Sequence, residues 1–397
     1  MRVSTLGAFE RGLGLMQALQ DTVSRRQEQI STGRRLLTPS DDPIAASRTL
    51  DLREALSRLD QFDRNANIAT GRLQTEEVSL ESISNVLQRV RELALQANNA
   101  TQSNESRGLI AVEMRQNLDQ LVQLANSQDG NGRYLFSGNS EDTLPVTTNG
   151  SAYAYNGDQG QRLIQIGANR SVADGDSGAE LFFRIRAGNG DFVVDAAAGN
   201  TGMGVVGETS VVDPTQYDQA QYTVRFIDST SYEVVDATNA VIATGSHQPG
   251  GTIAFKGIEI TIDGQAQGGD EFAVSPSPYQ DVFTSLEKLI GVVDTPVGDA
   301  ASRAALNNGI NNGILNIDQA IGRVLEVRTQ VGSRLASIEN QTDANSGLAL
   351  SVQQTVGGLE DLDYADALSH LTLELQVLQA SQQTFVRTQS LSLFNYL

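Results

Sequence analysis

Few side chains in this sequence could carry out acid–base or nucleophilic chemistry. There is no Cys, and the two histidines are His247 and His370. A Ser-His-Asp triad or a site with several His ligands is therefore improbable, and a thiolate metal site is excluded. Asp366 and His370 lie four residues apart and can pair on one helix face, but a lone histidine there is more often a plain polar side chain.

One loop contains carboxylates that a cation could use. The sequence DGDSG at residues 174–178 resembles the start of a calcium loop, yet Ile185 stands where the bidentate glutamate should be. No pair of carboxylates stands out from the other acidic residues of the middle segment. We therefore expect no metal and no cofactor, and an enzyme is the weakest of the functional interpretations.

The net charge of −20 is unevenly distributed along the chain. Residues 1–136 carry 16 basic and 17 acidic side chains, residues 137–280 carry 6 and 18, and residues 281–397 carry 6 and 13. Nucleic-acid binding needs clustered Lys and Arg, so this class is excluded. The acidic middle is most simply a solvated outer face, with receptor or host binding as the less favoured interpretation.

The sequence carries neither of the usual signals for membrane insertion or secretion. No run of 18 apolar residues exists, so we expect no transmembrane helix. The N-terminus also lacks the apolar stretch of a cleaved secretory signal. By these rules the protein would be cytoplasmic, unless another export route is used.

The positions of proline and the spacing of apolar residues predict the secondary-structure elements on which these residues lie. Residues 44–144 and 297–397 contain no proline, which is typical of long helices. Apolar residues repeat every seven positions, a pattern typical of coiled coils, and predict a helix that includes 6–30, one over 44–97 and others in the C-terminal part. A shorter helix is predicted near 107–127. Gly309, Gly313 and Gly332 either permit close helix packing or weaken the helix.

The middle of the chain predicts β-strands. Short runs of alternating or apolar residues, each bounded by turn residues, are typical of strands. The predicted strands are 152–155, 162–166, 181–185, 192–194, 222–227, 231–235, 240–244, 252–255 and 258–262. The predicted class is α+β, with long terminal helices forming an antiparallel coiled-coil bundle and a central β-rich domain inserted. The predicted parts are 1–136, 137–280 and 281–397. Whether 137–280 forms one domain or two lobes around 202–207 stays open.

Several segments resemble a known family. The sequence ISTGRRLLTPSDDP at residues 30–43 resembles the helix–turn–helix signature of the bacterial flagellin superfamily. Its motif residues are Gly33, Pro39, Ser40, Asp41, Asp42 and Pro43. Residues 1–5, NGRYLFSG at 131–138, EDLDYA at 360–365 and LSLFNYL at 391–397 are similar to the hook-associated protein 3 family within it. Gly33 can end a helix, and Asp41 or Asp42 can cap the next one, although either could instead bind a partner's arginine.

The resemblance implies a structural role in the bacterial flagellum. It implies an extracellular ring of subunits that links the preceding hook-associated junction protein to the flagellin filament. It also implies export by the flagellar type III system without a cleaved signal, with a flagellar export chaperone as a further partner. The alternative is flagellin itself, the bulk filament subunit, but flagellins usually end in a different sequence from LSLFNYL.

The seven-residue series of the terminal helices suggests which side chains would mediate assembly. This predicted seam comprises Phe9, Met16, Val23, Ile30, Leu371, Leu378 and Phe385. Such a seam can join two subunits or two helices of one chain, and we expect it to do both, because one chain cannot bury helices of this length alone.

Overall fold

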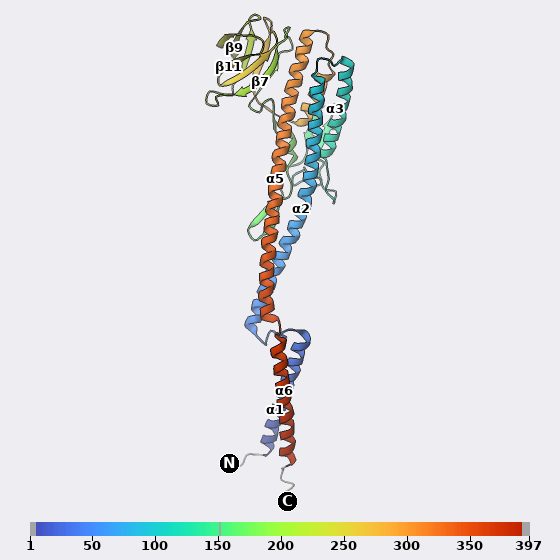
Figure 1. Cartoon of the computed structure of the whole chain (residues 1–397), viewed down its shortest axis with the longest axis vertical. Coiled ribbons are helices and arrows are strands. Elements are labelled where there is room, and N and C mark those ends of the chain that lie inside the picture. Colours follow the sequence, from blue (N-terminus) through green and yellow to red (C-terminus); the bar gives the residue numbers. More distant parts are fainter. Residues whose placement is uncertain (1–4, 151, 391–397) are drawn as a thin grey trace. The chain divides into compact units, whose positions relative to one another are not determined.

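The computed structural model describes residues 5–150 and 152–390, so the residues at 1–4 and 391–397 that carry part of the family resemblance lie outside the described residues. The described helices are α1 (Thr5–Thr32), α2 (Pro43–Ala97), α3 (Asn104–Ala125), α4 (Val282–Asp294), α5 (Ala300–Glu360) and α6 (Tyr364–Ser390). All the strands lie between α3 and α4, as Figure 1 shows by colour. The predicted α+β class, with long helices at both ends and a β-rich middle, is confirmed.

The helices follow the sequence signals closely, with one correction. The predicted start of the third helix at 107 is three residues late, because Ser103 caps α3 by accepting a hydrogen bond from the backbone N–H of Ser106. The helix α4 has the same kind of beginning, since the Asp281 carboxylate accepts from the Thr284 N–H at 2.6 Å. Local side-chain caps therefore decide where these two helices begin.

The chain forms two compact units. The terminal unit is Met1–Arg64 with Gln341–Leu397, and the central unit is Asn65–Asn340. In the terminal unit α1 lies along α6 (Figure 1). The helices α2 and α5 contribute residues to both units.

The strands belong to five sheets of the central unit. They are β1 (Val146–Asn149), β2 (Ala152–Tyr155), β3 (Leu163–Gly167), β4 (Arg170–Ala173), β5 (Ile185–Arg186), β6 (Phe192–Ala196), β7 (Val205–Val211), β8 (Tyr222–Phe226), β9 (Ser231–Asp236), β10 (Val241–Ser246), β11 (Gly251–Phe255), β12 (Ile258–Asp263), β13 (Glu271–Pro276) and β14 (Tyr279–Gln280). The two larger sheets have the orders β10-β9-β8-β13-β6 and β11-β12-β7, and all their pairs are antiparallel.

The middle segment contributes to two separate cores. Apolar side chains from β1, β3 and β4 and from residues 181–185 pack with α2–α5 in one cluster, whereas residues from β6–β9 and β11–β13 form a second cluster between the two larger sheets. The division falls between β5 and β6. It does not fall at 202–207, because Val206 lies inside the second core.

One predicted strand is wrong. Residues 181–185 fall largely in a π-helical turn, η1 (Ala179–Phe183), and only β5 follows it as a strand. Phe182 is buried edge-on against Phe136 at 5.5 Å between ring centroids, and Leu181 is also buried. A short apolar run does not distinguish a strand from a buried helical turn, so packing decides the conformation here.

The repeat NNGINNG at residues 307–313 of α5 divides the helix into faces with different neighbours. A Cβ at Gly309 would lie 2.7 Å from Val292, and one at Gly313 would lie 2.6 Å from Leu289, so these glycines let α4 approach closely. Gly332 has open space instead. Ile310, between the two glycines in sequence, is fully buried in the helical core.

The asparagines of the same stretch hold the β-strands. Asn308 accepts from the Val206 N–H at 2.7 Å and donates to the Gly204 carbonyl at 2.9 Å. Asn311 donates to the Val206 carbonyl, and Asn312 donates to the Val194 carbonyl, each at 3.0 Å. These side chains satisfy backbone groups of β6 and β7, each of which lies at one edge of its sheet.

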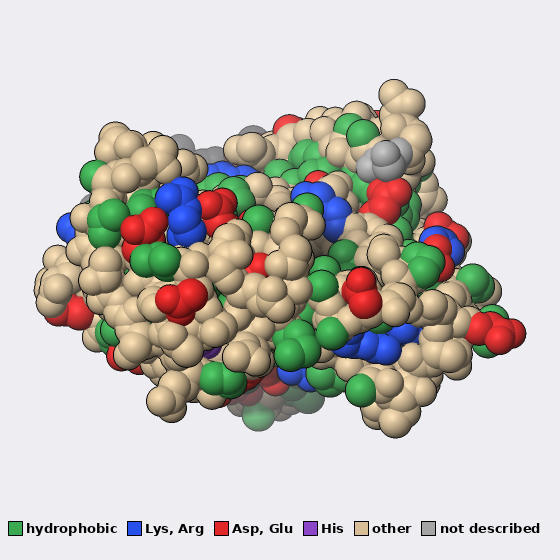
Figure 2. Space-filling view, turned by 90° about the horizontal axis from the view of Figure 1, so that it is seen from above, with side chains coloured by type: hydrophobic (Ala, Val, Ile, Leu, Met, Phe, Trp, Pro, Cys, Tyr) green, Lys and Arg blue, Asp and Glu red, His purple; other side chains and the backbone are tan. Residues whose placement is uncertain are grey.

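Charged side chains of both signs are mixed on the face that Figure 2 shows. Acidic and basic side chains lie near one another there, among many uncharged polar and backbone atoms. Within the middle segment, Arg225 forms an ion pair with Glu271 at 2.8 Å.

Candidate functional site

The helix pair of the terminal unit brings the two ends of the predicted seam together. The rings of Phe9 in α1 and Phe385 in α6 lie 5.2 Å apart between centroids, at an interplanar angle of 39°. Gly12 lies against the same ring, because a Cβ there would be 3.1 Å from Phe385 Cδ2. An aromatic pair and a close helix approach therefore fix this end of the pair.

The remaining seam residues also face the interior of the pair. Val23 is 6% exposed, and the other residues of the series are partly buried, namely Met16, Ile30, Leu371, Leu378 and Phe385. Phe9 remains 41% exposed. The predicted seam therefore makes contacts within one chain, and those contacts cover it only partly.

A second set of apolar side chains on these helices stays largely exposed in the described part of the chain. In α6, Leu368, Leu375 and Val386 are 51%, 43% and 63% exposed, and their spacings of seven and eleven residues place them on one face. Other exposed apolar residues of the pair are Leu13, Leu15, Leu373 and Val377. We call Leu368, Leu375 and Val386 the outer face. Sequence reasoning missed it, although the same seven-residue spacing marks it.

The turn between α1 and α2 joins two segments that are far apart in sequence. Gly33 has φ +69° and its carbonyl accepts from the Leu362 N–H at 3.0 Å. Arg35 donates its backbone N–H to the Glu360 carbonyl at 2.7 Å. The phenol of Tyr364 lies 2.8 Å from the place of a Cβ on Gly33. The structure therefore packs the family motif at 30–43 against the family motif at 360–365.

Asp41 and Asp42 have different roles in this turn. The Asp41 carboxylate accepts from the backbone N–H groups of Leu37 and Thr38 at 3.0 and 2.8 Å, and these hydrogen bonds, chiefly that of Thr38, hold its pKa below the ordinary value. Asp42 accepts from the Ala45 N–H at 3.0 Å and so caps α2, with Pro43 as the first helical residue.

The other motif residues complete the turn. Pro39 occupies the second position of a β-turn that is closed by the Asp41 N–H on the Thr38 carbonyl at 3.0 Å. Ser40 shares a hydrogen bond with the Thr38 hydroxyl at 2.7 Å. Arg25 and Arg35 of the same chain lie 3.6 and 3.8 Å from Asp41 and Asp42. The arginine neighbours of the two aspartates are therefore intrachain.

The residues considered for chemistry have structural neighbours. His247 is 4% exposed and packs edge-on against Phe226, while His370 lies 3.5 Å from Asp366 on an exposed helix face. In the loop at 174–178, Asp174 and Asp176 pair with arginines. Within residues 5–150 and 152–390, no group of three His, Asp or Glu side chains is placed to hold a metal ion. None of the helices in the described part of the chain has an apolar stretch that would cross a bilayer.

Comparison with known families gives matches to both helical ends and to the β-strands. The bacterial flagellin N-terminal helical region matches residues 3–141, and the flagellin C-terminal helical region matches residues 314–397. The D2-like domain of flagellar hook-associated protein 1 matches residues 196–276, which lie within the second β core.

Comparison with individual proteins narrows the family further. Flagellar hook-associated protein 3 of Salmonella typhimurium is 25% identical along 99% of both chains. The crystal structure of Xanthomonas campestris FlgL is 32% identical with a TM-score of 0.72, covering 77% of this chain and 99% of that one. Hook-associated protein 3 of Legionella pneumophila is 30% identical with a TM-score of 0.75, covering 78% and 98%.

Flagellins resemble the chain less completely. Flagellin of Salmonella montevideo is 25% identical, but the match covers 75% of this chain and 64% of that protein. The Xanthomonas campestris and Legionella pneumophila structures named above share the fold at 30% identity or more and are covered almost completely by this chain. On this likeness, together with the flagellin-type regions at both ends, the chain belongs to the flagellar hook-associated protein 3 family.

Proposed function

We propose that copies of this chain form a ring at the distal end of the flagellar hook and join it to the flagellin filament. The family is that of structural proteins of the hook–filament junction, and the chain is one of them. In this proposal the ring meets the preceding hook-associated protein on one side and flagellin on the other. The terminal helices α1 and α6 provide the contacts between neighbours.

The observation that carries this proposal is the exposure of the outer face. The seam already binds α1 to α6 within the chain, yet Leu368, Leu375 and Val386 remain about half exposed or more. Burying a leucine or valine side chain contributes about 1.5–3 kcal/mol, so an exposed row of them favours association with another apolar surface. Neighbouring copies and neighbouring flagellar proteins are the surfaces that a ring would offer.

Export and protection before assembly follow from the same features. A chain without cysteine forms no disulfide that could block its passage as an unfolded polypeptide, which supports export by the flagellar type III route without a cleaved signal. An export chaperone that covers the outer face of α6 would prevent aggregation before assembly. The export route and the chaperone are proposals that add to the location in the flagellum, which the likeness to the family supports.

A deletion strain tests the junction role. Cells without the protein should keep their hooks and release flagellin into the medium, because the filament would have no adaptor to grow on. Electron microscopy of the cells and immunoblotting of the medium measure both results. Filaments attached in normal number to the hooks of the deletion strain would contradict the proposal.

Complementation with single variants tests the outer face. Leu375→Asp places a charge within the apolar row, so it should leave the subunit folded and exported but should restore few attached filaments. Gln376→Asp adds the same charge at the next, exposed position of α6 and should restore them. Equal numbers of filaments with both variants would exclude the outer face as an assembly surface.

A further inference from the structure

A single carboxyl group interrupts the apolar series of α2. Glu76 occupies a position where the series otherwise carries apolar residues, and the structure buries it completely, at 0% exposure. Its Oε1 accepts a hydrogen bond from the backbone N–H of Asp176 at 3.1 Å. Its Oε2 is buried with no hydrogen-bond partner among the described residues. A carboxylate in this position would have one oxygen without any stabilising donor.

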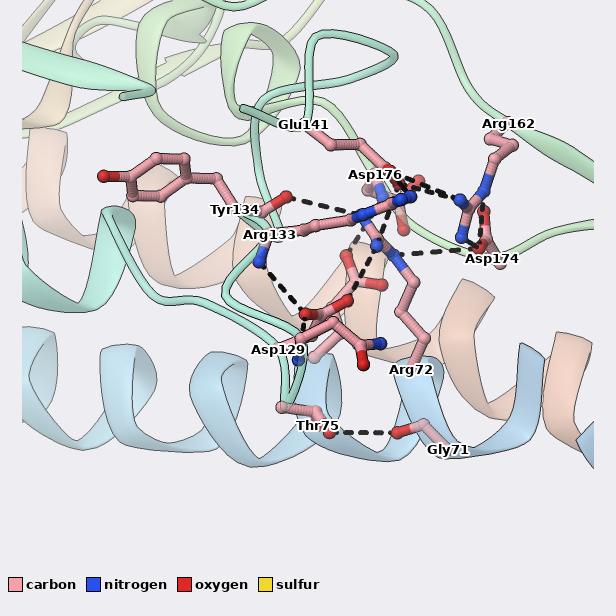
Figure 3. A network of polar contacts seen from close by, with 12 residues as sticks. Gly71, Arg72, Thr75, Asp129, Arg133, Tyr134, Glu141, Arg162, Asp174 and Asp176 are labelled. Atoms are coloured by element: carbon pink, nitrogen blue, oxygen red, sulfur yellow. Dashed lines mark hydrogen bonds and ion pairs between the residues drawn. The ribbon is translucent and has the colours of Figure 1, made fainter. Parts of the chain in front are cut away.

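Close to Glu76 lies a group of arginines and carboxylates that form ion pairs with one another. Figure 3 shows Arg72 of α2 between Asp129 and Asp174, which approach it from opposite sides at 3.1 and 3.7 Å. Glu141 lies 2.9 Å from Arg72 and 3.0 Å from Arg162, which also pairs with Asp174. The Arg72 side chain is 6% exposed and the Asp174 side chain 1%, so these charges are compensated inside the protein.

The nearest acidic neighbour of Glu76 already has its own partner. The Asp176 carboxylate receives two hydrogen bonds from Arg334 of α5, at 2.8 and 2.9 Å, and a third from Gln161 at 2.6 Å. Arg334 is therefore directed to Asp176 by a bidentate contact. Glu76 itself forms no ion pair among the described residues.

Counting charges identifies Glu76 as the acid in excess. The paired cations are Arg72, Arg133, Arg162 and Arg334, and the paired anions are Asp129, Glu141, Asp174 and Asp176. These four cations and four anions balance when Glu76 is neutral. An ionised Glu76 would add a fifth negative charge, buried and without a cation of its own, which is the costliest arrangement for a carboxyl group.

We propose that Glu76 retains a proton in the folded subunit at neutral pH and acts as a proton-dependent lock between α2, the segment that contains Asp176, and α5. In the neutral form Glu76 accepts the Asp176 N–H and adds no charge beside the Asp176–Arg334 pair. Loss of the proton would place two carboxylates next to each other in the interior. The contact of α2 with this segment would then be weakened, and the segment would loosen from the helices.

The groups that face Glu76 explain the direction of its titration. Burial raises the pKa of Glu76 most, and the adjacent Asp176 carboxylate raises it further, whereas Arg334 from α5 and Arg72 from α2 lower it. The net result is a pKa of about 8. Since the folded state holds the proton more tightly than the unfolded chain, the free energy of unfolding falls as pH rises from about 4.5 to about 8. Folding of the central unit therefore takes up a proton at neutral pH.

Carbon-13 NMR of the full chain labelled at glutamate tests the lock directly. The side-chain carboxyl carbon of Glu76, assigned by its absence in Glu76→Gln, should titrate with a midpoint near pH 8, while exposed glutamates titrate several pH units lower. A Glu76 midpoint in the same range as the exposed glutamates would overturn the proposal. The titration itself is measured on the unchanged protein; if Glu76→Gln does not fold, through-bond assignment of the unchanged protein identifies the Glu76 carboxyl carbon instead.

Thermal unfolding of matched variants provides the second measurement. In Glu76→Gln the carboxyl group is replaced by a neutral side chain of the same shape. Between pH 6 and pH 9, the melting temperature of the central unit in the unchanged chain should fall by about 5 °C or more relative to that in Glu76→Gln. Glu77→Gln is the control, because Glu77 is partly exposed and pairs with Arg328 of α5 at 2.6 Å. Its effect should be the same at both pH values. Parallel pH profiles for the unchanged chain and Glu76→Gln would overturn the lock.

Discussion

Phe385 shows how much of the terminal helix pair depends on one side chain. Its ring lies tilted against that of Phe9 and fills the space that Gly12 leaves on α1. Phe385 is partly buried, and few side chains of this pair are fully buried; among the described residues of α1 and α6, Val23 and Ala367 are the buried apolar ones. The aromatic contact is therefore a large share of what holds α1 to α6.

Phe385→Asp should separate the two helices at this end. A carboxylate cannot pack on Phe9, so we expect a loss of about 2 kcal/mol or more in pairing, and loss of incorporation at the hook tip, with an intact β core. Far-UV circular dichroism and complementation of the deletion strain measure the two effects. Phe385→Leu, which keeps an apolar side chain, serves as the comparison. Normal incorporation of Phe385→Asp would refute a role for the seam.

At the residue scale the sequence predicts inward-facing positions better than outward-facing ones. The seven-residue series selected Met16, Val23 and Leu378, and these side chains are buried or partly buried in the structure. It did not select Leu375 or the outer face, because spacing alone does not say which of two apolar rows the partner helix will cover. The sequence also could not decide whether Asp41 or Asp42 caps α2, because that depends on the backbone geometry of the turn.

The helix α5 is the element that connects the helical core with the β-strands. At the edge strands β7 and β6, Asn308 and Asn312 form the backbone hydrogen bonds that a neighbouring strand would otherwise form. Glycines on another face of α5 let α4 pack closely. The orientation of the second β core on this helix depends on hydrogen bonds from these side chains to backbone groups.

Replacing two of these side chains should loosen that attachment without unfolding either core. In Asn308→Ala with Asn312→Ala, the amide of Val206 loses its acceptor, and its hydrogen exchange should accelerate about tenfold or more, as expected for a loss of about 1–2 kcal/mol. NMR-detected exchange measures this amide. Asn340→Ala is the control, since Asn340 is exposed and bonds only within its own helix at Ala336. An unchanged exchange rate at Val206 would contradict the docking role.

At the element scale the long helices could be predicted and the sheet order could not. Absence of proline and a sustained seven-residue repeat are local signals, and they predicted α2 and α5. The position of β13 between β8 and β6 depends on contacts across some 80 residues of sequence, which no local pattern encodes. The strand predicted at 181–185 failed for the related reason that burial, and not alternation, determines its conformation.

The whole molecule has an uneven distribution of buried apolar side chains. In the terminal unit the buried hydrophobic residues among those described are Val23, Ala45, Leu59 and Ala367, whereas the central unit contains two extended clusters. A unit with so few buried contacts opens more readily, since local stability follows local burial.

Limited proteolysis of the free subunit should therefore begin at its ends. We expect the first cuts within α1 and α6 and a resistant fragment that contains the central unit. Mass spectrometry of the fragments over time locates the cuts. First cuts within the sheets of the second β core would contradict this order of stability.

At the scale of the whole chain the sequence predicted the class and the family but not the division of the middle segment. The composition of residues 137–280 suggests one β-rich region. The structure instead places buried apolar side chains of 146–150 and 152–186, such as Val146, Ile166 and Phe182, in the cluster formed by the helices. Such a division depends on three-dimensional proximity, which turn residues and alternation do not record.

The three differently occupied faces of α5 limit how the length of this chain can change. Deleting one residue between Gly309 and Gly313 would rotate everything beyond it by about 100°, so the asparagines, the glycines and Ile310 could not all keep their neighbours. We therefore expect insertions and deletions to be accepted at strand connections such as the turn before β10 rather than in this stretch of helix. The junction subunit can vary its outer surface by lengthening loops, while the phase of its central helix stays fixed.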